Sequence, residues 1–157
     1  MSILVFLFMV LMHIVEDFHV QGILAKMKQK NWWYGALWDS VAESSKEALP
    51  VEDIDKKVEE QYPKYRYDYI PALMIHAFEW SMFIHIPLMV WYGWTLGIPF
   101  ETNVVWLFIG SIAVNTLCHA YVDNLKANEL TINLVQDQLI HLMQIVMTFV
   151  MFWEVLG

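Results

Sequence analysis

The chain has 157 residues, of which 58% are hydrophobic and 17% are charged. Soluble domains carry about a quarter charged residues, so this composition argues against an ordinary soluble domain and against a disordered chain. The formal net charge of −8 argues against a partner that is a nucleic acid. A single cysteine, Cys118, excludes an internal disulfide framework and a cysteine-based zinc cluster. The sequence therefore predicts an all-α protein of a lipid bilayer.

Four stretches are apolar and long enough to cross the hydrocarbon core, which needs about 20 helical residues. They lie near residues 2–25, 70–94, 103–125 and 130–155. The first stretch has no basic region before it and no small-residue cleavage site, so we expect it to be retained rather than removed as a signal peptide. The expected fold is a polytopic four-transmembrane-helix bundle that forms a single membrane domain over 1–157.

The nine basic residues lie on one side of this arrangement. All but one fall between the first and second stretches, and the remaining one, Lys126, falls between the third and fourth. By the positive-inside rule, the segment 28–68 is cytoplasmic and both termini are outside. We therefore expect a multi-pass protein of the inner (cytoplasmic) membrane.

Part of the cytoplasmic segment has a helical pattern. Ile54, Val58 and Tyr62 follow one another at intervals of four residues, with acidic residues before Lys56 and Lys57. This pattern favours a short amphipathic helix that lies on the membrane or on the bundle. A solvated connector explains the same composition equally well.

Each of the four stretches carries polar side chains in its interior, where charge is costly and a functional role is the default expectation. Within each stretch these residues are three or four positions apart, so each set stays on one helix face. The sets are His13, Asp17 and Gln21; His76 and Glu79; Asn115, His119 and Asp123; and Asn133, Asp137, His141, Gln144 and Thr148.

Depth also supports a common site. Counted from the cytoplasmic edges at 1.5 Å per residue, four side chains from four helices lie at nearly one level, about 10 to 14 Å deep. They are Asp17, His76, His119 and Asp137. Imidazole and carboxylate groups together suit zinc, manganese or iron, and facing helices of a bundle build centres with one or two metals from such residues.

We therefore predict that seven side chains hold one or two divalent ions. They are His13, Asp17, His76, His119, Asp123, Asp137 and His141. A metal-free polar network or a proton relay is the alternative. His19 and His85 lie on other helix faces, and Glu16 is expected to point away from the set that contains Asp17, so none of these three is predicted to be a ligand.

Several motifs of the chain resemble a family of small bacterial and phage membrane proteins catalogued as domain of unknown function 3307. They are His13-Ile-Val-Glu-Asp17, His76 in the second stretch, His119-Ala-Tyr-Val-Asp123 and Asp137-Gln-Leu-Ile-His141. The resemblance spans all four stretches and leaves out 28–68. It implies a multi-pass membrane protein with His and Asp positions in its helices, and it implies no established reaction. The His-x3-Asp spacing alone is similar to that of integral-membrane metal-dependent hydrolases.

The first hypothesis on function is an intramembrane metal-dependent hydrolase. The ions would activate a bound water, and Glu79 or a non-ligating aspartate such as Asp123 would act as the general base. A site about 10 Å below the cytoplasmic surface suits a lipid headgroup, a phosphoester or a lipid-linked substrate. The alternatives are a metal-binding or ion-conducting membrane protein without catalysis, and a structural or lysis-related phage protein. Since the outer halves of the stretches are almost wholly apolar, a closed site is favoured over a pore.

Overall fold

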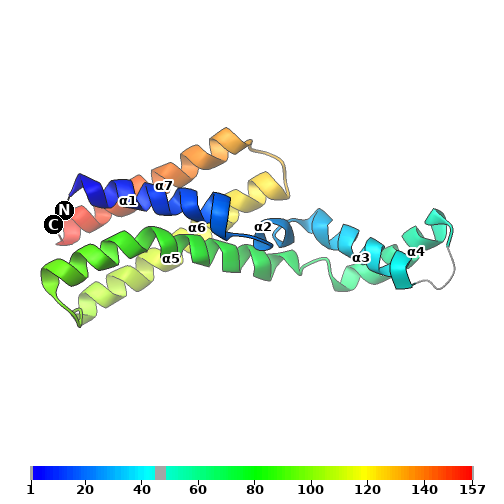
Figure 1. Ribbon diagram of the computed structural model, residues 1–157, viewed down its shortest axis with the longest axis horizontal. Helices are drawn as coiled ribbons and strands as arrows, with labels where there is room; N and C mark the ends of the chain where they lie inside the picture. Colours follow the sequence, from blue (N-terminus) through cyan, green and yellow to red (C-terminus); the bar gives the residue numbers. More distant parts are fainter. Residues whose placement is uncertain (1, 45–48, 157) are drawn as a thin grey trace.

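The computed structural model describes residues 2–44 and 49–156, and these residues form helices and connecting turns without any strand. Four helical segments are long and apolar enough to cross a membrane. They are α1 (Ile3–Val15) with its continuation η1 (Glu16–Val20), α5 (Tyr69–Leu96), α6 (Thr102–Ala127) and α7 (Leu134–Leu156). Figure 1 shows these segments side by side in one bundle, with the two ends of the chain close together. The all-helical fold and the four candidate spans agree with the sequence-based prediction.

The half of the bundle nearest the two chain ends is an apolar core. It is built from α1, α5, α6 and α7, and its fully buried members include Met9, Leu88 and Ile145. The polar hydroxyl of Tyr92 is satisfied there, because it donates a hydrogen bond of 2.7 Å to the carbonyl oxygen of Phe152. This half therefore holds the four helices together around a largely apolar interior.

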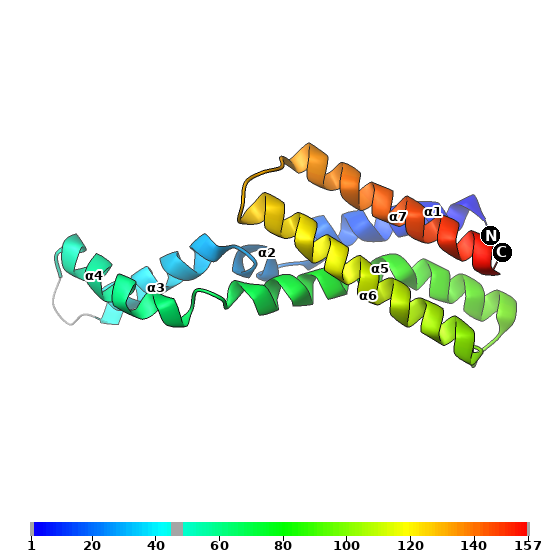
Figure 2. The ribbon, with the colours of Figure 1, turned by 180° about the vertical axis from the view of Figure 1, so that it is seen from behind.

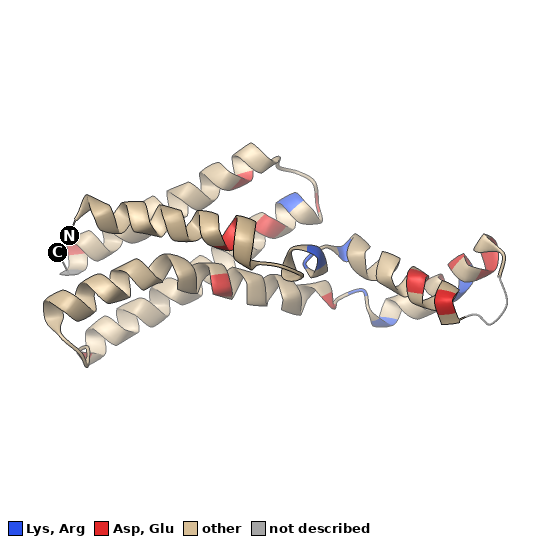
Figure 3. Ribbon diagram, in the orientation of Figure 1, with Lys and Arg blue, Asp and Glu red and all other residues tan. Residues whose placement is uncertain are grey.

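The charges gather at the opposite end. Figure 3 shows the described Lys and Arg residues beyond the middle of the bundle, around α2 (Leu24–Met27), α3 (Lys30–Ser44), α4 (Val51–Gln61) and the end of α6. The helices α3 and α4 extend away from the bundle (Figures 1 and 2). The molecule is therefore strongly asymmetric along its length, with an apolar end and a charged end.

The helix predicted between residues 51 and 62 is present as α4, and it packs against α3 rather than on the bundle. Its apolar residues Ile54 and Val58 are buried against Val41 of α3. Trp38 of α3 also donates a hydrogen bond of 2.9 Å from Nε1 to Oδ1 of Asp55. The amphipathic face of α4 is thus covered by α3, so the two helices form a hairpin with its own small apolar core.

The first span ends earlier than its apolar sequence predicted. After α1, the turn η1 is a π-helix, in which the backbone N–H of Gln21 bonds to the carbonyl of Glu16 five residues before it. Gly22 follows with a φ of 49°, a left-handed conformation that glycine adopts without the clash of a Cβ atom. The chain therefore leaves the helix at Gly22, before the predicted limit at residue 25.

The fourth span begins later than predicted, at Leu134 instead of residue 130. The side chain of Asn133 accepts a hydrogen bond from the backbone N–H of Gln136, and the Gln136 side chain accepts one from the backbone N–H of Asn133. This reciprocal pair is a capping box, which satisfies free donors of the first helical turn. Asn133 is therefore a helix cap rather than part of the polar face of α7.

Candidate metal centre

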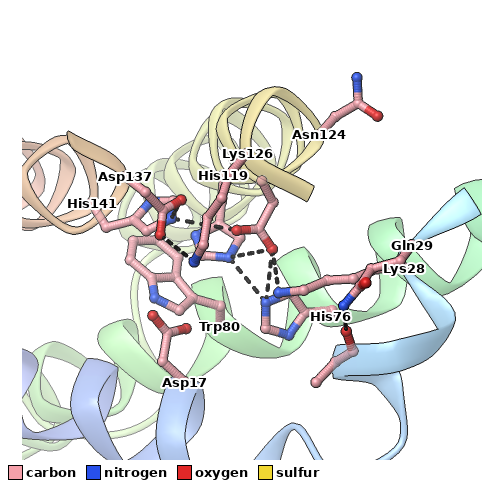
Figure 4. Close-up of polar contacts among 12 residues, drawn as sticks. Asp17, Lys28, Gln29, His76, Trp80, His119, Asn124, Lys126, Asp137 and His141 are labelled. Atoms are coloured by element: carbon pink, nitrogen blue, oxygen red, sulfur yellow. Dashed lines mark hydrogen bonds and ion pairs between the residues drawn. The ribbon is translucent and has the colours of Figure 1, made fainter. Parts of the chain in front are cut away.

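Three buried histidines from three helices, His76, His119 and His141, lie close together in the interior of the bundle (Figure 4). His76 of α5 has its Nε2 atom 3.1 Å from Asp123 Oδ2 and 3.2 Å from Nε2 of His119. His119 of α6 has its Nε2 atom 3.7 Å from Asp123 Oδ2, and His141 of α7 has its Nε2 atom 3.7 Å from Asp123 Oδ1. All four side chains are buried.

These separations match the spacing of ligands around one ion. Two overlapping groups have ligand atoms that all lie within 4.8 Å of one another: Asp17, His76 and His119 form one, and His119, Asp123 and His141 form the other. Ligand atoms about 2.1 Å from a tetrahedral zinc ion are about 3.4 Å apart from each other. The donor set of imidazole and carboxylate therefore has both the chemistry and the spacing for a divalent metal.

The outer nitrogens of two of these histidines face oxygen atoms. Nδ1 of His76 lies 3.1 Å from Oε1 of Glu16, although the two are not aligned as a hydrogen bond. Nδ1 of His141 lies 3.0 Å from Oε1 of Gln144. Metal-bound histidines commonly donate their other N–H to a carboxylate or carbonyl oxygen, which fixes the ring and directs the free lone pair at the metal. His141 has this hydrogen bond, and His76 has a carboxylate at the corresponding position.

His119 is positioned by ring stacking instead. Its imidazole stacks against the indole of Trp80, at a centroid distance of 4.3 Å and an angle of 24°, and against the imidazole of His141, at 4.0 Å and 25°. Trp80 is fully buried at the centre of the bundle and is four residues after His76, on the same face of α5. The indole thus forms a rigid wall of the cluster, a role that the sequence analysis did not assign to it.

Glu16 is a correction to the sequence analysis, which placed it away from the site. Its side chain is completely buried beside His76, and neither of its oxygen atoms has a hydrogen-bond partner among the described residues. Glu16 follows His13 by three residues and Asp17 follows it by four, so both lie on the helix face of His13. The turn η1 that begins at Glu16 packs against α5, and this contact places Glu16 beside His76.

Two lysines are bound to the carboxylates of the cluster. Lys28, at the end of α2, is nearly buried and lies with Nζ 2.5 Å from Oδ2 of Asp123. Lys126 of α6 has its Nζ atom 2.7 Å from Oδ2 of Asp137. Lys28 is held in place because Asn128 donates a hydrogen bond of 3.0 Å to its carbonyl oxygen. From the sequence, both lysines indicate only topology, since no spacing rule connects the loop residue Lys28 to α6.

Formal charges at the cluster do not cancel. Four acidic side chains lie at the cluster or beside it, and two lysine ammonium groups pair with them. The acidic residues are Glu16, Asp17, Asp123 and Asp137. With all four ionised and the imidazoles neutral, two negative charges have no cationic partner among the described residues, and buried charge of this kind requires compensation. A single divalent cation would supply that charge.

Two predicted ligands lie at the edge of the cluster and in neither ligand group. Nδ1 of His13 accepts a hydrogen bond of 2.8 Å from the indole N–H of Trp80 and is 3.5 Å from Asp17. Asp137 has its Oδ1 atom 3.2 Å from Nε2 of His141, while its Oδ2 atom accepts hydrogen bonds from Lys126 and Gln138. Asp137 is therefore adjacent to one ligand, and His13 is further from the converging Nε2 atoms.

Glu79, the predicted general base, is not brought to the cluster. Its side chain is half-buried, belongs to neither ligand group, and makes no hydrogen bond or ion pair with the part of the chain that the structure describes. His85 also lies elsewhere, as expected. Its Nδ1 atom is 2.7 Å from the carbonyl oxygen of Ser81 and its Nε2 atom is 2.8 Å from Oγ of Ser111. His85 therefore donates from Nδ1 and accepts from the serine hydroxyl.

A small polar cavity of about 100 Å³ reaches the cluster from the charged end of the bundle. It is lined by Asp17, Phe18, Gln21, Lys28, Asp123, Lys126, Leu134 and Gln138. The volume is sufficient for a few water molecules. Because Asp17 and Asp123 belong to the two ligand groups, this cavity is where water or part of a ligand can meet the candidate metal centre.

Comparisons with known proteins supply no relative for this chain. No protein-family model matches it, and neither a curated protein nor a solved structure is significantly similar to it.

Proposed function

We propose that the chain is a multi-pass protein of the inner (cytoplasmic) membrane, with the α3–α4 hairpin in the cytoplasm and both termini outside. The four apolar helical segments and the one-sided distribution of Lys and Arg support this placement. We also propose, from the motifs quoted above, that it belongs to the family catalogued as domain of unknown function 3307.

Within this bundle, we infer that His76, His119, Asp123 and His141 bind a divalent metal ion, with Asp17 as a further ligand or as the ligand of a second ion. The observation that carries this proposal is the convergence of three Nε2 atoms on one buried carboxylate, with Glu16 behind His76. The carboxylate of Glu16, 3.1 Å from Nδ1 of His76, favours a proton on that nitrogen, which leaves the lone pair of Nε2 for the ion.

The reaction that this site supports best is hydrolysis of a lipid or phosphoester substrate. A divalent ion in the centre would supply Lewis acidity and an activated water. The cavity beside Asp17 gives water access to the centre from the charged end of the bundle. Hydrolysis adds the hydroxyl of water to the phosphorus or carbonyl atom and transfers a proton to the leaving oxygen. When a single ion is held by His76, His119, Asp123 and His141, Asp17 is a free carboxylate in that cavity, where it accepts a hydrogen bond of 3.0 Å from Gln138 and is placed to carry the proton.

Turnover can be tested on the purified full-length protein in detergent, loaded with zinc or manganese and incubated with a total bacterial lipid extract. Mass spectrometry of the extract should show lipids that lose a headgroup or an acyl chain, and the loss should stop when the metal is chelated. Asp17→Asn should lower the rate by about a hundredfold, the effect typical of a residue that transfers a proton. Lys57→Met, on the far hairpin, should have no effect.

A metal-binding protein without catalysis is the second candidate function, and the ion pairs Lys28–Asp123 and Lys126–Asp137 favour it because they occupy the carboxylates from the side of the cavity. If the metal-loaded protein leaves every lipid unchanged, and Asp17→Asn behaves as the unaltered protein does, then the hydrolase is wrong and the metal-binding scaffold is correct.

A further inference from the structure

A second cavity, of about 370 Å³, lies where the chain enters α5. It is lined by Lys30, Tyr62, Pro63, Arg66, Tyr67 and Tyr69, of which none is acidic. Two of these residues are cations that lie over aromatic rings: Nζ of Lys30 is 5.0 Å from the ring centroid of Tyr69, and the guanidinium of Arg66 is 4.9 Å from that of Tyr67. The cavity is therefore a basic site with flat aromatic walls.

The charge of this cavity differs from that of the metal centre. Lys28 and Lys126 pair with aspartates, whereas neither Lys30 nor Arg66 forms an ion pair within residues 2–44 and 49–156. Lys30 is held by its backbone, whose N–H donates a hydrogen bond of 2.8 Å to Asn128 at the end of α6. The bundle thus fixes the backbone of Lys30 and leaves its ammonium group available to an anion.

The position of the cavity relates it to the metal centre. Tyr69 is the first residue of α5, and His76 follows seven residues later, on the same helix face and about 10 Å further along the axis. Because α5 is one of the apolar segments long enough to span a membrane, its first turn is at the polar edge of that segment. Lipid phosphates lie at this level in a bilayer, where tyrosine and basic side chains gather.

We propose that this cavity binds the phosphate of an anionic phospholipid, and that such a lipid is the substrate class of the metal centre; the proposal rests on the membrane placement and function proposed above. Lys30 and Arg66 supply charge-assisted hydrogen bonds to phosphate oxygens, and Arg favours the paired geometry of a phosphate. The half-buried rings of Tyr62 and Tyr69 limit the access of water. The exposed apolar side chain of Ile70, next to the cavity, is placed to contact an acyl chain.

The test uses the full-length protein in an uncharged detergent and calorimetric titration with three probes: dihexanoyl phosphatidic acid, dihexanoyl phosphatidylcholine and inorganic phosphate. We expect phosphatidic acid to bind saturably, and the other two to bind at least about tenfold more weakly, since each lacks either the net charge or the apolar chains. The double variant Lys30→Met/Arg66→Met should lose about tenfold or more in affinity for phosphatidic acid. The matched control Lys56→Met/Lys57→Met removes the same charge from exposed positions of α4 and should bind normally.

Three outcomes would overturn the proposal. Equal binding of inorganic phosphate would show a site for the free anion, equal binding of phosphatidylcholine would show only apolar adsorption, and unchanged binding by Lys30→Met/Arg66→Met would place the lipid elsewhere. If Lys30→Met/Arg66→Met has the same thermal unfolding midpoint and the same metal content as the unaltered protein, a loss of lipid binding is not due to misfolding. His119→Ala separates the two proposals, because it should lose metal and keep phosphatidic acid binding; if it keeps metal while lipid binding behaves as expected, only the metal proposal fails.

Discussion

Nδ1 of His76 lies 3.1 Å from Oε1 of Glu16, while Nε2 of the same ring lies 3.1 Å from Oδ2 of Asp123. The two carboxylates come from different helical segments, η1 and α6, and both are buried. His76 is therefore clamped between one acid that faces the candidate metal position and one that lies behind the ring. This arrangement allows the two acids to be tested separately.

Glu16→Gln should weaken metal binding by about 10- to 100-fold, the effect typical of removing a carboxylate behind a metal-bound histidine. Glutamine keeps the size of the side chain, so the bundle should still form, but it holds the Nδ1 proton of His76 less strongly. The measurement is competition for zinc between the purified protein and a fluorescent chelator. Glu79→Gln is the matched control, since Glu79 lies in the same bundle and outside both ligand groups. Equal losses in the two variants would contradict the role of Glu16.

Lys28→Met should make the protein bind a divalent ion about tenfold more tightly, because the ammonium group competes with the ion for Asp123. Without metal the same variant should unfold at a lower temperature, since breaking a buried ion pair leaves a carboxylate unpaired at a cost of about 3 to 5 kcal/mol. Thermal unfolding with chelator and with added zinc measures both effects.

The exposed Lys26→Met serves as the control for Lys28 and should change neither value. A Lys28→Met protein that is destabilised and gains nothing from zinc would indicate that the lysine belongs to a metal-free polar network.

The topology predicts opposite labelling of two exposed positions. After Cys118→Ser removes the native thiol, Glu60→Cys on α4 should be protected from a membrane-impermeant maleimide added to intact cells. Glu101→Cys, immediately before α6, should react. Both should react once the cells are opened. Reaction of Glu60→Cys and protection of Glu101→Cys in intact cells would invert the proposed orientation.

The sequence was sufficient to predict the long helices and the residues on their polar faces. The length of each apolar stretch is sufficient to identify the four segments. A spacing of four residues places His119 and Asp123 on one helix face, and Asp137 and His141 on another, independently of which helices pack against them. The sequence could not indicate which apolar surface covers α4, because Ile54 and Val58 fit a membrane, the bundle or α3 equally well. The structure selects α3.

The errors within the site concern residues whose surroundings helical periodicity leaves open. Glu16 shares the helix face of His13 at a spacing of three residues, and only the packing of η1 on α5 shows that it is buried beside His76. Lys28 reaches Asp123 from the connecting segment that follows the turn at Gly22. Helical periodicity does not predict the position of a residue in such a segment. Conversely, Glu79 is three residues after His76 and is therefore expected on the same helix face, but its side chain is only half-buried. One face of a helix covers a wider area than a metal site, so a residue can share the face without reaching the site.

Metal content is the measurement that tests the account most directly. The full-length protein, purified without added metal or chelator and then dialysed against a buffer that contains zinc, manganese and iron, should retain about one or two divalent ions per chain by elemental analysis. His119→Ala should retain almost none, since His119 belongs to both ligand groups, whereas His85→Ala, which removes an equally buried histidine bound to Ser81 and Ser111, should retain the full amount. A folded protein without bound metal, or the same metal content in the two variants, would contradict a metal centre and leave a metal-free polar network as the explanation of these residues.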